Sequence, residues 1–435
     1  MSEIQQRQMR PVMLCALGLS TLAGSAAQAG GLLLYEIGTA DVGLAAAGYT
    51  ARAQDAGTVF TNPAGMTRLE GDQITLGLQA LYGRASFNID PSATSPRLGS
   101  DSGGNAIGWF PGGGFFYSHS ISPDLKVGMA LTGNFGLSIK YNDGWAGRYR
   151  TQESTLIGVS FVPAVAYRVN DKLSLGASVS AMRGAFKTVV GVNNAFGPDG
   201  QLTLDDNVWG FGGNLGLLYE FNPGTRLGIT YNSQIKLDFD APAQWSGTGP
   251  VLSTVLRARG LQNANVSLGM NVPQGVNAGI YHEINDHWAL LGSVGWQQWS
   301  KFGMLDVGID SNNPVSLTAN QNYKDTWHLA AGTQYRASER VTLMGGIAYD
   351  SGFQDSNNIP PAIPANAAWR FGFGGQVVES KSFNWGLSAE YLYAGSLKTN
   401  LSGLPPIIGG RGNLAGSYEQ PAGILFLAAN LNFKF

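Results

Sequence analysis

Alternation of apolar and polar side chains along strand-length segments is the feature that most constrains how this 435-residue chain can fold. In residues 208–221, for example, Trp209, Phe211, Leu215 and Tyr219 share one face, and small or polar residues occupy most positions between them. A period of two places the two groups on opposite faces of a β-strand. A soluble β-sandwich alternates in the same way, so the pattern by itself leaves the solvent open.

Three further features favour a barrel in an outer membrane. Many of the alternating segments are roughly 13 to 20 residues long, whereas strands usually have about 5–6 residues. Trp209 and Tyr219 bracket a stretch of roughly 33 Å of strand, which at a tilt of ~40° projects to about 25 Å, the height of an outer-membrane apolar band. The connections alternate between short turns and long loops, which is typical of such barrels.

Together these features predict an all-β fold, a 14-stranded antiparallel transmembrane β-barrel. Because the strand number is even, the barrel begins and ends at the short-turn, periplasmic side. The loop after the fifth strand is expected at Gly191 to Asp205. The strands are expected near residues 72–89, 106–121, 124–134, 153–168, 171–190, 206–221, 224–240, 264–284, 287–303, 323–336, 339–351, 366–378, 382–398 and 416–435.

The long loop after the seventh strand contains a short helical pattern. Val251, Leu252, Val255 and Leu256 fall on one face at helical spacing. We therefore expect a short helix in this loop.

The first residues predict a signal peptide. Arg7 and Arg10 precede an apolar run at 12–22, and the small residues that follow end in Ala-Gln-Ala at 27–29. This is the order of a cleaved secretory signal, with cleavage expected after Ala29. A transmembrane anchor is the alternative, but the run is too short and too rich in Gly and Ser for one.

Composition and motifs exclude several other functions. Charged residues make up 13% of the chain and the formal net charge is -2, so no nucleic-acid partner is expected. The single cysteine, Cys15, lies in the signal region, which leaves no disulfide framework. The four histidines lack metal-ligand spacing, and Ser118 and His119 are strand neighbours that face opposite sides. We therefore expect no enzyme activity, no cofactor and no metal site.

The segment before the first strand does not alternate. Residues 30–69 are rich in Gly and Ala and contain the turn cluster Asn-Pro-Ala-Gly at 62–65. Such a segment cannot face lipid, because its backbone groups would lack hydrogen-bond partners there. It must lie in the periplasm or inside the barrel, where fourteen strands leave room for a plug.

The chain resembles the FadL-type outer-membrane transporters of long-chain fatty acids and other hydrophobic compounds. The clearest match is the segment 55–65, Asp-Ala-Gly-Thr-Val-Phe-Thr-Asn-Pro-Ala-Gly, around the hatch motif Asn62, Pro63 and Ala64. Further matches lie at 133–137, 209–211, 299–302 and in the closing strand. The resemblance covers essentially the whole mature chain. It implies a signal peptide at 1–29, an N-terminal hatch inside the lumen at 30–70 and the barrel at 71–435.

The resemblance also implies a mechanism. Substrate passes from outside into an apolar pocket, the hatch shifts, and the substrate leaves sideways through a gap made by an inward kink of the third strand. In this chain the kink maps onto Asn134, Phe135 and Gly136. Glycine suits a strand that bends or loses pairing. The alternative is that Gly136 simply ends the strand at its loop.

Recognition of a fatty-acid carboxylate would need a basic group in the lumen. The resemblance implies Lys187 for this role, with Arg183 of the same strand parity and the free amine of Gly30 as further candidates. Lys187 and Arg183 could instead be solvated rim charges. At a second basic position of the family this chain has Asp306. The departure makes uptake of neutral aromatic or alkane hydrocarbons the alternative to long-chain fatty acids.

The remaining expectations concern location and partners. The chain should be a monomer in the bacterial outer membrane and contact its lipid and lipopolysaccharide. The terminal Phe435 resembles the signal that outer-membrane assembly machinery recognises. Two other functions stay open at this point, an open polar porin with a periplasmic extension and an outer-membrane lipase.

Overall fold

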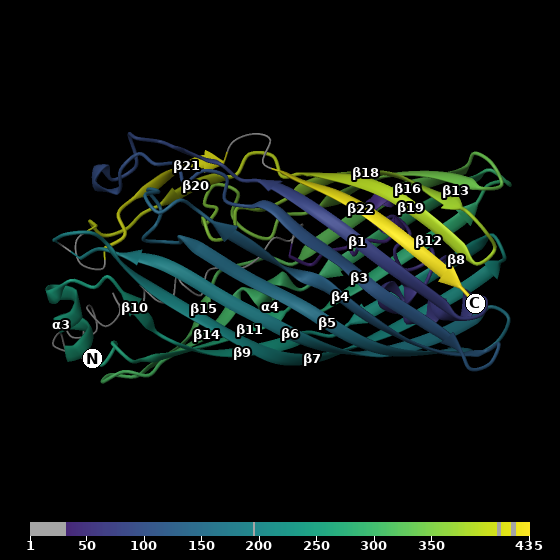
Figure 1. Ribbon diagram of the computed structural model, residues 1–435, viewed down its shortest axis with the longest axis horizontal. Coiled ribbons are helices and arrows are strands. Elements are labelled where there is room, and N and C mark those ends of the chain that lie inside the picture. Colours follow the sequence, from purple (N-terminus) through teal and green to yellow (C-terminus); the bar gives the residue numbers. More distant parts are fainter. Residues whose placement is uncertain (1–31, 195, 407–409, 419–422) are drawn as a thin grey trace.

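The computed structural model describes residues 32–194, 196–406, 410–418 and 423–435, and its main body is a closed antiparallel β-barrel (Figure 1). Fourteen strands form the wall, and pairing of β7 with β8 completes the ring. The predicted 14-stranded fold is thus confirmed. Around the barrel the strands are β7 (Gly200–Asn222), β6 (Leu173–Val192), β5 (Glu153–Arg168), β4 (Leu125–Lys140), β3 (Gly108–Ser120), β1 (Gln73–Arg84), β22 (Gly423–Lys434), β19 (Phe383–Tyr393), β18 (Ala368–Val378), β17 (Val341–Asp350), β16 (Thr326–Arg336), β13 (Trp288–Gln297), β12 (Gly275–Glu283) and β8 (Thr225–Asn232).

The outward face of the wall is apolar. On β7, Trp209, Phe211 and Leu215 are 56%, 66% and 61% exposed. Large apolar side chains exposed over a whole surface mark a protein that lies in a membrane. The residues between them, including Gly210 and Asn214, face the lumen, as the alternation predicted.

The two ends of the barrel differ. Strands are joined by short turns at the end where the C-terminus lies, and long loops gather at the other end (Figure 1). In outer-membrane barrels these ends face the periplasm and the cell exterior, respectively. The C-terminal Phe435 is exposed, and its backbone exchanges two hydrogen bonds with Asp72. No helix in the described residues is long and apolar enough to cross a membrane.

Four neighbouring wall strands are interrupted, which the alternation did not indicate. The expected strands 224–240 and 264–284 are each divided in two. The expected strand 287–303 ends as a strand at Gln297 and continues as a short helix, and a separate strand precedes 323–336. Pro273 lies at one of these breaks and has no N–H to offer a ladder. The outer parts form a second sheet of β15 (Val315–Asn320), β14 (Met304–Ile309), β11 (Asn265–Val272) and β9 (Ile235–Pro242), and helix α4 (Trp299–Phe302) lies between β13 and β14.

Several other strand boundaries were also wrong. β1 ends at Arg84 instead of near residue 89, β19 ends at Tyr393 instead of near residue 398, and β22 begins at Gly423 instead of near residue 416. β4 continues to Lys140 instead of ending near residue 134. β6 and β7 stay paired as far as Val192 and Gly200, so the expected loop Gly191 to Asp205 is shorter. Both extensions carry apolar side chains on their inner faces, which the extracellular part of the lumen buries.

The loops at the extracellular end contain regular elements. The expected short helix is α3 (Pro250–Ala258); Leu252 and Leu256 are buried, whereas Val251 is exposed. The three-residue strand β10 (Gln244–Ser246) extends the wall beside β7. A small sheet of β2 (Phe87–Ile89), β21 (Leu414–Tyr418) and β20 (Lys398–Leu401), with the turn η3 (Pro96–Leu98), completes this end.

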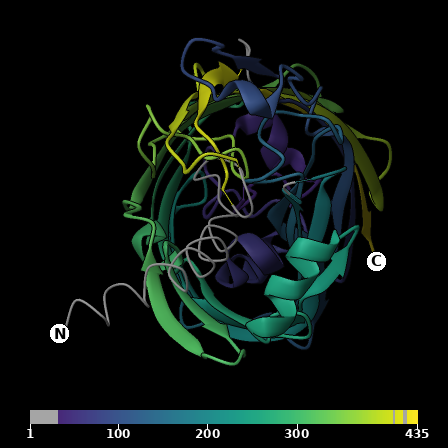
Figure 2. The ribbon, with the colours of Figure 1, turned by 90° about the vertical axis from the view of Figure 1, so that its left-hand side faces the viewer.

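Residues 32–69, hereafter the hatch, lie inside the ring of strands (Figure 2). Their regular elements are short: η1 (Ala40–Leu44), α2 (Thr58–Thr61) and η2 (Pro63–Arg68). Nearly all of their side chains are buried against the wall. The expected signal peptide, residues 1–29, and Gly30 lie outside the described residues, so the division at residues 29 and 70 stays a prediction.

An apolar cluster occupies the lumen between the second sheet and the inner faces of β6 and β7. Phe239 of β9 packs on Phe186 of β6 with ring centroids 5.3 Å apart. Trp299 and Phe302 of α4 enter the same cluster and are 0% and 2% exposed. Apolar packing of this kind is non-directional and scales with the area removed from water. The extracellular half of the lumen is therefore held mainly by apolar contact.

Candidate transport site

The hatch motif is fixed by the side chain of Asn62. Its Oδ1 atom accepts from the N–H of Ala64 at 3.1 Å, and its Nδ2 atom donates to the carbonyls of Thr50 (2.7 Å) and of Leu217 on β7 (3.0 Å). Asn62 thereby caps η2, and Pro63 takes the first helical position, where its missing N–H costs nothing. The motif shapes the hatch and attaches it to the wall.

Inward-facing glycines of the wall let the hatch backbone come close. A Cβ atom on Gly176 of β6 would lie 2.6 Å from the carbonyl carbon of Pro63, and one on Gly372 of β18 would lie 2.6 Å from the carbonyl oxygen of Val42. No side chain fits at such distances. Five further glycines, on β1, β7, β8, β16 and β17, are similarly close to the hatch: Gly77, Gly216, Gly228, Gly332 and Gly346.

A buried ion cluster joins the hatch to the wall. The Nε atom of Arg370 lies 2.6 Å from Oδ2 of Asp350, and its Nη1 atom lies 3.1 Å from Oε1 of Glu390 and also contacts Glu36 of the hatch. Arg370 is 0% exposed, and the three carboxylates are 1–2% exposed. A buried charge is tolerated only when paired and hydrogen-bonded. Glu36 can therefore leave the wall only if this pairing is replaced.

The same ion cluster includes His328 and lies beside Tyr35 of the hatch. The Nδ1 atom of His328 is 2.7 Å from Oδ1 of Asp350, and its ring stacks on Tyr35 with centroids 4.3 Å apart. We call Glu36, His328, Asp350, Arg370 and Glu390 the hatch–wall ion cluster. It connects the hatch to β16, β17, β18 and β19.

The third barrel strand, β4, bulges at Asn134. Its register with β5 shifts between Gly133 and Phe135, so Asn134 is the extra residue. Gly136 has φ of +137°, a conformation that favours glycine. The bulge turns Phe135 inward, where it is 2% exposed. β4 therefore continues past Gly136, so the alternative that this glycine ends the strand is wrong.

The hatch pairs with this bulge. Leu34 donates its N–H to the carbonyl of Asn134 at 2.9 Å, and Gly136 donates to the carbonyl of Leu32 at 2.8 Å. Leu33 and Phe135 form an isolated antiparallel bridge. The start of the described hatch thus supplies hydrogen bonds to the strand at its kink.

A wall gap separates β3 from β4 above the bulge. The two strands pair only from Gly114 to Ser120 on β3, and Thr132 Oγ1 donates to the carbonyl of Gly113 at 3.1 Å. The next backbone hydrogen bond is that from Lys140 to the carbonyl of Ala106 at 2.8 Å. Pro111 borders the gap on β3, and a proline suits an edge without a ladder partner. On the outer side, Trp109 is 64% exposed beside the gap.

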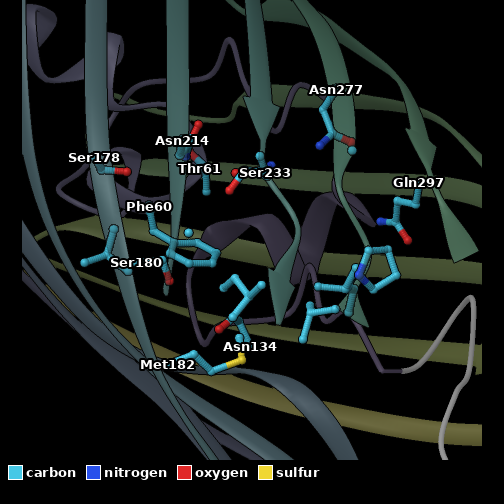
Figure 3. A pocket seen from close by; sticks show the side chains of 18 of the residues that line it. Phe60, Thr61, Asn134, Ser178, Ser180, Met182, Asn214, Ser233, Asn277 and Gln297 are labelled. Carbon is cyan, nitrogen blue, oxygen red and sulfur yellow. The ribbon is translucent and has the colours of Figure 1, made fainter. Parts of the chain in front are cut away.

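A pocket lies between the hatch, the bulge and the wall, and leaves about 100 Å³ for the centres of water-sized molecules. Figure 3 shows Phe60 and Thr61 of the hatch beside Ser178, Ser180 and Asn214 of β6 and β7. None of the described lining residues is charged. The lining mixes apolar side chains with amides and hydroxyls: Leu33, Leu34, Tyr35, Tyr49, Phe60, Thr61, Asn134, Val162, Ser178, Ser180, Met182, Asn214, Asn232, Ser233, Ile235, Val272, Pro273, Asn277 and Gln297, with Gly212, Gly213 and Gly275.

Two polar atoms of this pocket lack partners among the described residues. The Oγ atom of Ser178 and the Oδ1 atom of Asn214 are buried without hydrogen bonds, although the two residues are 7% and 8% exposed and lie opposite each other on β6 and β7. A buried polar group without a partner is costly. The pair is therefore suited to a neutral polar group of a ligand.

The structure places the expected basic residues elsewhere. Lys187 and Arg183 share the outward face of β6; Lys187 pairs with Glu153 at 2.6 Å, and Arg183 lies over the outward ring of Trp209. Neither side chain faces the lumen, which is the arrangement of the alternative, charges at the rim, and a role in carboxylate binding stays a prediction. Asp306 likewise lies on the solvent-exposed face of β14 and accepts from Thr318. Gly30 lies outside the described residues.

The pocket residues could in part have been found from the sequence. On β6 the inward positions are those of even number, so Ser178, Ser180 and Met182 follow from the alternation once the outward face is known. Ile235, Val272 and Pro273 could not be found in this way, because they lie at the breaks that lead into the second sheet. Periodicity is a local signal and does not reveal where a strand leaves the wall.

Comparison with known proteins identifies the family. The family described as Outer membrane protein transport protein (OMPP1/FadL/TodX) matches residues 20–434. The chain is 27% identical to a "Long-chain fatty acid transport protein" of Escherichia coli O6:H1, over 96% of each chain. Its fold is similar to a Pseudomonas aeruginosa FadL homologue (TM-score 0.82, 19% identity, 93% and 100% of the chains). It is also similar to the Pseudomonas putida toluene transporter TodX (TM-score 0.66, 18% identity, 91% and 97%).

Members of this family are transporters and not enzymes, and named relatives are outer-membrane proteins. The match covers the hatch and every wall strand of this chain. The chain therefore belongs to the OMPP1/FadL/TodX family and is a transporter of hydrophobic compounds in the bacterial outer membrane.

Proposed function

We propose that this protein takes up long-chain fatty acids by passive diffusion and releases them sideways through the wall gap between β3 and β4. The observation that carries the proposal is that pocket, hatch and gap share one residue. Asn134 lines the pocket, and its carbonyl accepts from the hatch residue Leu34. It is also the extra residue of the β4 bulge, which lies just beyond Thr132, where the pairing of β4 with β3 ends.

Movement of the hatch would open this route. The backbone of Leu32–Leu34 now occupies the bulge. If this segment withdraws, β4 loses two hydrogen bonds and the pocket gains a path toward the wall gap. A substrate that fills the pocket and contacts Leu33 and Leu34 would compete with that docking.

Release into the bilayer suits an apolar substrate. Each methylene that enters water costs roughly 0.8 kcal/mol, so a long acyl chain has a large barrier to passage through an aqueous pore. A lateral path from the pocket to the membrane avoids that exposure. The exposed Trp109 beside the gap, whose ring contacts that of Tyr82, offers an apolar surface on the outer side.

The choice of fatty acids rests on the named relatives. The Escherichia coli relative, which aligns over nearly the whole chain, carries the name of a long-chain fatty acid transport protein. A second candidate, a neutral aromatic hydrocarbon, is favoured by one observation. The described pocket lining contains no charged side chain that would pair with a carboxylate.

Deletion of Asn134 tests the lateral route. Removing the extra residue would let β4 pair continuously with β5 and straighten the strand. We expect uptake of oleate by cells to fall at least tenfold, while binding of oleate to the purified barrel stays within about threefold.

Asn134→Ala is the matched control, because it keeps the residue count and therefore the bulge. Its uptake should fall much less than that of the deletion variant, and any loss measures the Asn134 side chain in the pocket lining, not the bulge. Normal oleate uptake by the deletion variant, at equal surface expression, would contradict lateral release at β4. Replacing oleate by toluene in the same assay separates the two substrate candidates.

A further inference from the structure

A second cavity lies at the extracellular end of the lumen and contains two arginines. It leaves about 410 Å³ for the centres of water-sized molecules. Arg150 comes from the loop between β4 and β5, and Arg411 from the chain before β21. The cavity wall also includes Thr151, Tyr323 and Ala362.

Arg150 is held in place but is not neutralised by its known contacts. Its Nη2 atom donates to the carbonyls of Leu401, Ser402 and Gly412 at 3.1, 2.9 and 2.7 Å. Its Nε atom is buried and has no hydrogen-bond partner among the described residues. Three carbonyls fix one edge of the guanidinium, and no carboxylate of the described residues forms an ion pair with it.

Arg411 brings a second positive charge to the same cavity. Burial, together with the neighbouring charge of Arg150, lowers the pKa of Arg411 to about 9. Burial also lowers the pKa of Arg150 to about 10. Two partly buried like charges repel, and an anion between them would relieve both the repulsion and the lost hydration. Among the described lining residues the carboxylate is that of Asp355, which accepts from the N–H of Asn357 in its own turn.

Part of the cavity wall is apolar, beside polar lining residues such as Gln321 and Asn358. Tyr323 and Ala362 belong to the apolar cluster, and the ring of Tyr323 packs on Phe353 with centroids 4.7 Å apart. The same cluster contains Ile235 and Val272, which line the pocket at the hatch. One continuous apolar body therefore borders both the arginine cavity and the pocket.

We propose that Arg150 and Arg411 form an anion site for the carboxylate of a long-chain amphiphile, whose chain follows Tyr323 and Ala362 into the apolar cluster. This inference rests on the proposed function and deepens it, because it assigns the charge recognition that the hatch pocket lacks. Guanidinium groups suit carboxylates because they offer paired N–H donors in one plane. A small inorganic anion would use the arginines but gain nothing from the apolar wall.

Binding of oleate and methyl oleate to the purified, folded barrel tests the site. The two probes share one chain and differ only in charge. In Arg150→Gln and in Arg411→Gln, oleate should bind about tenfold more weakly, as expected for a lost charge-assisted hydrogen bond. Binding of methyl oleate should stay unchanged. Raising the salt concentration should weaken oleate binding in the unchanged protein and have less effect in the variants.

Arg183→Gln is the matched control, since it removes the same charge from the outward face of β6. It should leave the affinities of both probes unchanged. Arg411→Lys tests charge retention and should recover part of the oleate affinity. Because Arg150 also binds three carbonyls, folding of its variant is checked by heat-dependent migration in gels. If Arg150→Gln does not fold, the result of Arg411→Gln alone tests the site.

Several results would overturn the inference. One is equal weakening of oleate and methyl oleate, which would indicate an altered apolar wall; another is unchanged oleate affinity in both arginine variants. Displacement of oleate by equimolar inorganic phosphate would show an anion site without preference for amphiphiles. If the Asn134 deletion blocks uptake while both arginine variants bind oleate normally, lateral release stands and the arginine site fails. If the arginine variants lose oleate while the Asn134 deletion still transports it, the reverse holds.

Discussion

The two halves of the lumen are held by different forces. On the hatch side, the Asn62 amide, the backbone of Leu32–Leu34 and the hatch–wall ion cluster make directed contacts of defined length. On the extracellular side, Phe186, Phe239 and the residues of α4 make apolar contacts without such direction. Directed bonds specify one position, whereas apolar contacts can be exchanged for an acyl chain at little cost. On the proposed function, we therefore expect substrate to displace the apolar packing before the hydrogen bonds.

The largest effect is expected from Arg370→Met. It leaves Asp350, Glu390 and Glu36 buried without their cation, which should lower stability by about 3–5 kcal/mol. We expect a looser hatch and a larger ion conductance in planar bilayers. Arg183→Met, on the outer face, is the control. Unchanged conductance in a folded Arg370 variant would show that the ion cluster does not hold the hatch.

Gly136→Val should come next. The φ of +137° is unfavourable for a β-branched residue, and a Cβ atom there would lie 2.6 Å from the Cα atom of Ile157. A cost of about 2–3 kcal/mol is expected, together with reduced oleate uptake. Gly133→Ala is the control, since no atom lies within 4 Å of the added Cβ. Normal uptake and stability of the valine variant would show that the bulge does not require glycine at position 136.

The apolar half should tolerate a change of shape. Phe239→Leu keeps an apolar side chain and should lower stability by about 1 kcal/mol, with oleate uptake retained. Phe371→Leu on the outward face of β18 is the comparison, because Phe371 is 49% exposed. If Phe239→Leu abolished uptake in a folded barrel, the apolar cluster would be as position-specific as the hatch contacts.

The smallest effect is expected from Lys187→Ala. The ion pair with Glu153 is partly exposed on the outer face, so its loss should cost less than about 1 kcal/mol. Oleate affinity should not change, since this side chain does not line the pocket. Glu153→Ala, which loses the same ion pair but keeps the lysine, is the control. Weaker oleate binding in Lys187→Ala alone would show that Lys187 contributes to ligand binding.

Much of the wall could be predicted because alternation is a local property. Each strand repeats its inward and outward positions, and the aromatic spacing gives the height of the apolar band. The alternation along β6 also indicates which way its two basic side chains point. Arg183 and Lys187 share it with Leu175 and Val179, which are 45% and 56% exposed on the outer face.

The second sheet and the arginine cavity could not be predicted in this way. The divided strands depend on packing between β9 and the glycines of β7; a Cβ atom on Gly210 would lie 2.6 Å from the carbonyl oxygen of Lys236. Arg150 and Arg411 lie in separate loops far apart in the chain, and no spacing rule joins them. The kink residues came from a family motif, since a glycine in a strand by itself does not distinguish a bulge from a strand end.

The wall glycines that contact the hatch constrain how the hatch and the wall can change in evolution. Gly176, Gly228 and Gly346 belong to three different strands, yet each leaves space for a different part of the same short hatch segment. The inner surface of the barrel is therefore complementary in shape to this particular hatch. A hatch transplanted from a relative would seat only where the recipient barrel has glycine at the matching heights. Hatch and wall must consequently change together during evolution, and chimeras that exchange one without the other should assemble poorly.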